Sequence, residues 1–257
     1  MKITVITVAY NSAATIADTA ASVLAQEHAA VEYLVIDGGS TDATVAELEP
    51  FQAGIEAIVS EPDQGMYDAM NKGVQRASGE VIAILNSDDV YADAAVLARV
   101  AEVFADPAVD CVYGDLHYVA ADDLNQVVRD WRSGPYRPGL FARGWHPPHP
   151  AFFVRRAVYE AVGGFDHSLR IAADYEFMLR VLHKYRCRVA YLPAVLVKMR
   201  TGGASNQSLT NILQANRECY SAWRINGYGV LTGLFAILCK PLRKLRQFAR
   251  RAPRQVK

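Results

Sequence analysis

The alternation of short β-branched runs with helical segments over about the first 90 residues constrains the fold most strongly. Apolar runs flanked by polar or glycine-bearing turns predict strands at residues 3–8, 33–36, 55–59 and 81–85. Segments with helical periodicity separate them, at residues 14–26, 43–48 and 66–77. This order is typical of a mostly parallel sheet covered by helices, so the sequence predicts an α/β fold.

Polar segments follow each predicted strand. They are residues 10–12 (YNS), 37–42 (DGGSTD), 61–65 (EPDQG) and 86–89 (NSDD). Ligands of open α/β sheets bind beyond the carboxyl ends of the strands. We therefore expect the functional site at this edge of the sheet.

Several common nucleotide-binding and hydrolytic motifs are absent from the sequence. Gly38 and Gly39 do not fit GxGxxG, and neither GxxxxGK[ST] nor GxSxG occurs. A dinucleotide-binding unit, a P-loop and a hydrolase nucleophile elbow therefore lack their signatures. Aspartates at strand ends remain, and carboxylates can hold a divalent cation together with a polyphosphate.

Asp88 and Asp89 follow a buried run and should emerge together at the sheet edge. One carboxylate could hold Mg²⁺ or Mn²⁺ while its neighbour binds a ribose or sugar hydroxyl. A turn that caps a helix from residue 92 would explain the same pair, and an Asx turn would explain Asp37. From the residues alone, both interpretations stay open.

Four segments, in this order, resemble the landmarks of family 2 glycosyltransferases, which have the GT-A fold. They are residues 5–11 (VITVAYN), 35–42 (VIDGGSTD), 79–89 (GEVIAILNSDD) and 173–180 (ADYEFMLR). Residues 60–73 (SEPDQGMYDAMNKG) are similar to a block of bacterial transferases of the colanic-acid and exopolysaccharide type. The resemblance implies a single Rossmann-like GT-A domain at residues 1–205, followed by an amphipathic helical extension at residues 206–257.

The resemblance also implies which residues bind the donor and the metal. Asp37 would accept a hydrogen bond from the nucleobase, and Asp89 would be the direct ligand of Mn²⁺ or Mg²⁺. Asp88 would be a second ligand or a donor contact. The remaining donor-binding residues would be Thr7, Ala9, Tyr10, Asn11, Asp63 and Lys72. A solvated helix face would equally explain Lys72.

Asp174 matches the position of the family's catalytic base, although Ala173 stands where the family's motif has Glu. A carboxylate there would take the proton of an acceptor hydroxyl as its oxygen attacks the anomeric carbon, which inverts the configuration. The departure at Ala173 affects the expected acceptor contacts more than the base. An acid placed at a helix N-terminus by the macrodipole is the alternative explanation.

A stiff segment rich in Trp, His and Pro at residues 145–150 is a second candidate region. His146 and His149 could contact phosphate, acceptor or metal there. A plain turn residue is the alternative for either histidine.

The net charge of zero conceals two regions of opposite sign. Lys plus Arg and Asp plus Glu number 27 each, but eight bases and no acid lie between Lys240 and Lys257. The preceding 239 residues therefore carry 19 bases against 27 acids, which argues against nucleic acid as a partner. The basic tail suits an anionic membrane surface.

Apolar residues recur at helical spacing from Leu231 to Phe248, beside the bases of the tail. This pattern is typical of a helix that lies in a membrane interface, and Pro241 should kink or split it. A terminal helix packed on the catalytic domain is the alternative.

Together these features predict an inverting, metal-dependent glycosyltransferase with a nucleotide-diphosphate-sugar donor. Its acceptor would be a carbohydrate, in particular a lipid-linked oligosaccharide of bacterial surface polysaccharide synthesis. No apolar block resembles a secretory signal or a span of about 20 residues, so we expect a cytoplasmic protein, peripheral on the inner face of the cell membrane. Two other hypotheses stay open, a nucleotidyltransferase acting on a sugar phosphate and a non-catalytic membrane module that binds nucleotides.

Overall fold

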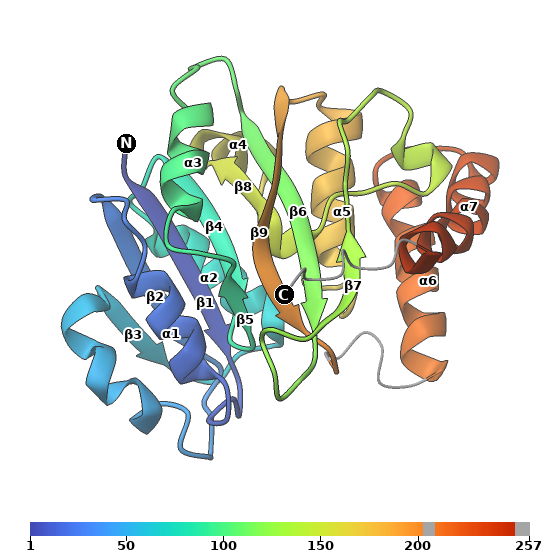
Figure 1. Ribbon diagram of the computed structural model, residues 1–257. Coiled ribbons are helices and arrows are strands. Elements are labelled where there is room, and N and C mark those ends of the chain that lie inside the picture. The colour runs from blue at the N-terminus through green and yellow to red at the C-terminus, as the bar shows by residue number, and fades with distance from the viewer. Residues whose placement is uncertain (203–208, 250–257) are drawn as a thin grey trace.

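The computed structural model describes residues 1–202 and 209–249, with side chains described at residues 1–202 and 210–240. In this part of the chain, nine strands form one sheet in the order β3-β2-β1-β4-β8-β6-β9-β5, and β7 also pairs with β6 (Figure 1). The strands are β1 Ile3–Ala9, β2 Val31–Asp37, β3 Ala57–Ser60, β4 Val81–Asn86, β5 Asp89–Tyr91, β6 Cys111–Val119, β7 Val127–Trp131, β8 Phe152–Arg155 and β9 Val189–Arg200. The α-helices are α1 Ile16–Leu24, α2 Met66–Arg76, α3 Val96–Val103, α4 Arg156–Val162, α5 Ala173–Leu179, α6 Leu209–Ile225 and α7 Val230–Ala249.

The first four strands run parallel and end in one row. Ala9 pairs with Asp37 between β1 and β2, and Asp37 pairs with Ser60 between β2 and β3. Val8 pairs with Asn86 between β1 and β4. The loops after these strands therefore leave the sheet at one edge, and the predicted α/β fold is confirmed.

Alternation along β1 builds two cores, one on each face of the sheet. Ile3 and Val5 pack with residues of α1 and α3, which lie in front of the sheet in Figure 1. Ile6 and Val8 pack on the other face with residues of α2, α4 and α5. Because successive strand residues point to opposite faces, one buried strand supplies both layers.

Beyond β4 the sheet is mixed, and here the sequence patterns missed several elements. β4 pairs antiparallel with β8 and β8 with β6, whereas β6 and β9 run parallel. β9 was not predicted because Pro193 interrupts its apolar pattern. The register with β6 shifts beside Pro193, between the pairs Tyr113–Tyr191 and Asp115–Val195, and this irregularity accommodates a residue that cannot donate to the ladder. β5 and β7 were missed as well, and the helix considered from residue 92 begins at Val96, as α3.

Two helical segments are not plain α-helices. The helix expected at residues 43–48 is a 3₁₀ helix at Ala46–Gly54, with Pro50 inside it. The segment that begins at Ala173 is α-helical to Leu179, and a π turn follows at Arg180–Lys184.

The C-terminal helices α6 and α7 lie together at the side of the molecule away from β3 (Figure 1). Trp223 of α6 and Ala236 of α7 are fully buried in the same cluster as Tyr175 of α5. The ammonium of Lys240 lies 4.3 Å from the centre of the Tyr175 ring and 3.0 Å from Sγ of Cys219. Both helices are therefore packed against the body of the protein.

α7 also carries an exposed apolar stripe, which consists of Leu231, Leu234, Phe235 and Leu238. Their exposed fractions are 81%, 47%, 55% and 73%. Residues three, four and seven positions apart share one face of a helix, so the stripe forms a continuous apolar strip on the surface.

The helix α7 continues through Pro241 to Ala249, so Pro241 does not split it. The side chains of the basic tail after Lys240, as far as Lys257, lie outside the described residues. No helix in the part that is described is long and apolar enough to cross a membrane.

Replacement of Trp223 by Ala should lower the free energy of unfolding by about 3–5 kcal/mol, because it empties a fully buried site between α5 and α6. Leu231→Ala is the matched control, since Leu231 is exposed on the neighbouring helix, and should change stability by no more than about 0.5 kcal/mol. Urea denaturation of both variants measures this. Equal, small effects would contradict the packing of α6 into the core.

Candidate active site

The loops that follow β1, β2 and β4 are joined by hydrogen bonds into one floor. The side-chain oxygen of Asn11 accepts from the Thr41 N–H at 2.9 Å, and the Asn11 N–H donates to Ser40 Oγ at 2.8 Å. The hydroxyls of Ser12 and Ser87 lie 2.7 Å apart. These contacts fix three loops that are distant in sequence at the same edge of the sheet.

Asp37 lies beneath this floor and is fully buried. Its Oδ1 accepts from the Ser40 hydroxyl at 2.5 Å, and its Oδ2 accepts from the Ser40 N–H at 3.0 Å and the Ser60 hydroxyl at 2.6 Å. The carboxylate therefore connects the end of β2 with the end of β3.

The residues expected along β1 divide between the interior and the surface. Thr7 is fully buried, and its hydroxyl accepts from Tyr33 at 3.1 Å. Ala9 is buried at the end of the strand, whereas Tyr10 is 63% exposed. Of these three side chains, the ring of Tyr10 is the one that a ligand at the edge can reach.

Asp63 and Lys72 lie at the next loop, after β3. Oδ1 of Asp63 accepts from the Gly65 N–H at 2.7 Å. Lys72 donates to the carbonyl of Pro62 at 3.0 Å and forms an ion pair with Glu61 at 3.0 Å. The hydrogen bond with Glu61 raises the pKa of Lys72. Lys72 thus holds the loop in place with its charged end.

Asp88 and Asp89 occupy the turn between β4 and β5, with different exposure. Asp88 is partly exposed, whereas Asp89 is fully buried as the first residue of β5. Oδ2 of Asp89 accepts from the Asn86 amide at 3.0 Å, and its Oδ1 has no hydrogen-bond partner in the described part of the chain. Burial raises the pKa of Asp88, and burial together with the Asp88 charge raises that of Asp89 well above its usual value.

Asp174 lies in the first turn of α5 and is connected to α2. Its Oδ1 accepts from the Tyr175 N–H at 2.7 Å and lies 3.1 Å from the Tyr67 hydroxyl, whose one proton is shared with the Ile171 carbonyl at 2.9 Å. Burial and the Asp174 charge hold the pKa of Tyr67 well above its usual value, so this hydroxyl stays protonated and donates. Burial raises the pKa of Tyr118 on β6, and the charges of Asp89 and Asp174 both add to this rise, so each carboxylate lies near this ring.

Of the two histidines of the Trp- and Pro-rich segment, His149 is buried and His146 is half-buried, and the pKa of each is lowered. Burial and the nearby Lys240 charge lower the pKa of His146 to about 3, and its Nδ1 lies 3.0 Å from the Pro147 carbonyl, to which it donates. The His146 ring packs edge-on against Trp131 and Tyr175. Burial lowers the pKa of His149, and the charge of Asp174 opposes this shift. His149 is thus the histidine that lies toward the acidic site.

The helix α6 braces α5, which sequence reasoning did not anticipate. Oε2 of Glu218 accepts from the N–H groups of Ile171 and Ala172, at 2.7 and 2.9 Å, immediately before α5. The amide of Asn226 donates to Oε1 of Glu176 at 2.8 Å. No local pattern signals these contacts, because each joins residues about 50 positions apart.

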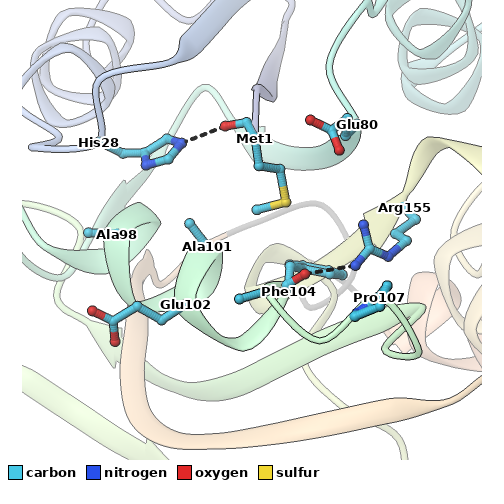
Figure 2. Close-up of a pocket in the computed structure, with 10 residues that line it drawn as sticks. Met1, His28, Glu80, Ala98, Ala101, Glu102, Phe104, Pro107 and Arg155 are labelled. Carbon is cyan, nitrogen blue, oxygen red and sulfur yellow. Dashed lines mark hydrogen bonds between the residues drawn. The ribbon is translucent and has the colours of Figure 1, made fainter.

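No cluster of three or more His, Cys, Asp or Glu side chains suited to a metal occurs among the described residues. A hollow of about 610 Å³ lies elsewhere, lined by Met1, Glu80 and Arg155 among others (Figure 2). These residues begin or flank the parallel strands, so this hollow is at the edge opposite to the aspartates.

The chain belongs to glycosyl transferase family 2, whose family model matches residues 4–163, and it is therefore a glycosyltransferase. It is 33% identical over 206 residues to an "uncharacterized glycosyltransferase" of Mycobacterium tuberculosis, which covers 79% of this chain and 77% of the relative. It is 32% identical over 187 residues to a PGL/p-HBAD biosynthesis glycosyltransferase of Mycobacterium bovis, with 68% of each chain covered.

Solved structures are similar in fold. TarS of S. aureus, solved as residues 1–349 with UDP, superposes with a TM-score of 0.68 at 18% identity, covering 96% of this chain and 72% of that 1–349 chain. A mannosyltransferase from Pyrobaculum calidifontis, solved with GDP-Man and Mn²⁺, superposes with a TM-score of 0.66 at 18% identity. The match covers 98% of this chain and 76% of the mannosyltransferase chain. The expected GT-A type of α/β fold is confirmed.

Proposed function

We propose that this chain is an inverting, metal-dependent glycosyltransferase that moves a sugar from a nucleotide-diphosphate donor to a carbohydrate acceptor. Membership of the family supports sugar transfer over nucleotidyl transfer or simple nucleotide binding. Similar folds solved with UDP and with GDP-Man support a nucleotide-linked donor. In this proposal residues 1–205 carry the donor, metal and base sites, and residues 206–257 brace the base and face the membrane.

The observation that carries the proposal is the half-satisfied carboxylate of Asp174. The Tyr175 N–H donates to Oδ1, and the Tyr67 hydroxyl shares its one proton between this oxygen and the Ile171 carbonyl, whereas Oδ2 accepts no hydrogen bond from the residues that the structure describes. A general base needs a fixed carboxylate with one oxygen free to receive a proton. Oδ2 would take the proton of the acceptor hydroxyl as that oxygen bonds to the anomeric carbon. The bond from this carbon to the diphosphate breaks on the opposite face, so the configuration inverts.

Asp88 and Asp89 have the chemistry that a divalent cation requires. Burial raises the pKa of both carboxyls, no described cationic side chain forms an ion pair with either one, and Oδ1 of Asp89 lacks a partner. Mg²⁺ and Mn²⁺ bind through one or two carboxylates when a diphosphate supplies further ligands. Asp89, whose Oδ1 has no partner in the described part of the chain, would be the direct ligand in this proposal, with the more exposed Asp88 as a second ligand. The cation would neutralise charge on the leaving diphosphate.

The exposed stripe of α7 supports an acceptor at a membrane. Burial of one such side chain contributes about 1.5–3 kcal/mol, and each base near an anionic surface adds about 1 kcal/mol. A lipid-linked oligosaccharide of bacterial surface polysaccharide synthesis would meet the site there, with the protein peripheral on the inner face of the cell membrane. Because α7 also packs on Tyr175 through Lys240, point variants of the stripe test this better than truncation.

Asp174→Asn should lower kcat by about 10²- to 10⁴-fold, because it removes the proton acceptor. The Kd of the nucleotide donor should stay within about threefold, measured by calorimetry. Asp166→Asn, in the loop before α5, is the control and should retain activity. Equal losses in donor affinity and in turnover would assign Asp174 a structural role instead.

Chelation with EDTA should abolish transfer, and Mn²⁺ or Mg²⁺ should restore it. Asp88→Asn should raise the metal concentration needed for half-maximal activity by about 10-fold or more, since it removes a charged ligand. Asp123→Asn, at the exposed β6–β7 turn, is the control and should leave this metal concentration unchanged. Full activity of the wild type in the chelator would rule out the metal site.

The double variant Leu231→Gln/Leu238→Gln should bind vesicles containing an anionic lipid at least about 10-fold more weakly, because two exposed apolar contacts are lost. Val128→Gln, which alters an exposed apolar residue of β7, is the control and should bind as the wild type does. Vesicle co-sedimentation measures both. Unchanged binding of the double variant would show that the stripe does not contact lipid.

A further inference from the structure

Asp37 is the aspartate expected to contact the nucleobase, but both of its carboxylate oxygens already accept hydrogen bonds from the protein itself. Two hydroxyls and one N–H donate to it, and none of its surface is exposed. A nucleobase would have to displace Ser40 or Ser60 to reach either oxygen. Neither oxygen of Asp37 is therefore open to a base at this edge.

Asp63 is the carboxylate that occupies the open position above the end of β2. A Cβ built on Gly38 would fall 3.0 Å from Cγ of Asp63 and closer still to its Oδ2. Gly38 does not have the left-handed backbone that requires glycine, whereas the adjacent Gly39 does, at φ +79. The absence of a side chain at position 38 thus serves to give Asp63 its space.

The loop that carries Asp63 is held firmly. The Glu61 N–H donates to the Asp37 carbonyl at 3.0 Å, and Lys72 donates to the Pro62 carbonyl at 3.0 Å. The Gly65 N–H occupies Oδ1 of Asp63 at 2.7 Å, and within the described residues Oδ2 accepts no hydrogen bond. One oxygen of a partly exposed, fixed carboxylate is therefore available to a ligand, on the same row of strand ends as Tyr10.

We infer that Oδ2 of Asp63 reads the pairing edge of the donor's base and selects bases with a ring N–H there, namely uracil, thymine and guanine. An ionised carboxylate only accepts hydrogen bonds, and those bases present a donor at N3 or N1. Cytosine and adenine present a ring nitrogen with a lone pair at the equivalent position, which a carboxylate repels. This inference rests on the proposed function, because it needs a nucleotide donor.

The variant Asp63→Asn distinguishes recognition of the base by Asp63 from a purely structural role in holding its own loop. The Gly65 N–H needs an acceptor, so the amide oxygen of the substituted side chain keeps that bond and its NH₂ group takes the place of Oδ2. The loop is then preserved while an acceptor becomes a donor. Binding of UDP, GDP, TDP, CDP and ADP to both proteins, measured by calorimetry with Mn²⁺ present, reports the base preference directly.

The wild type should bind at least one of UDP, GDP and TDP more tightly than CDP and ADP. Asp63→Asn should weaken that nucleotide by about 10- to 100-fold, the effect of losing a hydrogen bond to a charged group, and should leave CDP unchanged or tighter. Asp68→Asn, on the first turn of α2, is the matched control and should preserve the order of affinities.

The second test exchanges the residues at positions 38 and 63. Gly38→Asp alone should weaken binding, because its side chain collides with Asp63, and Gly38→Asp/Asp63→Gly should restore the preference. Nucleotide binding with an unchanged base preference in Asp63→Asn would overturn this inference and leave the proposed function intact. If the wild type bound none of the five nucleotides, both would be overturned.

Discussion

The parallel register of β1 to β4 is the constraint on which the site depends. Because Ala9, Asp37, Ser60 and Asn86 end their strands at matched positions, four loops far apart in sequence leave the sheet side by side. Asp37 then bonds across to Ser60, and Asn11 across to Thr41. A slip of one residue would turn every side chain of a strand to the other face, and it would remove both cores and the floor of the site together.

Where a motif is local, the sequence was enough to predict the structure. The apolar runs gave the four parallel strands, and the position of Asp88 and Asp89 at a strand end follows from the buried segment before them. Features that depend on contacts between distant segments could not be predicted from the sequence. Asp88 and Asp89 are adjacent in sequence yet differ in exposure, because β5 begins at the second of them and draws it into the sheet. Pairing of β5 with β9 decides this, and that contact spans about 110 residues.

The same reasoning explains why Asp63 has a carboxylate oxygen without a hydrogen-bond donor in the described part of the chain, whereas Asp37 does not. A pattern of residue types indicates that both stand at strand ends, but it does not reveal which carboxylate is surrounded by donors. Ser60 lies 23 residues after Asp37 and saturates it, while the bare Cα of Gly38 leaves room for Asp63. Likewise, the brace that Glu218 provides for α5 depends on how α6 returns to the sheet, about 46 residues later in the chain.

The packing of Trp223 and Ala236 beside Tyr175 has a consequence for biosynthesis. Chains fold from the N-terminus as they are made, yet the helix that bears Asp174 gains its last neighbours only when α6 and α7 have been synthesised. The nascent chain therefore completes the surroundings of α5 and the exposed stripe of α7 in the same step. In the proposed function, this order would give a newly made molecule its turnover and its affinity for lipid together.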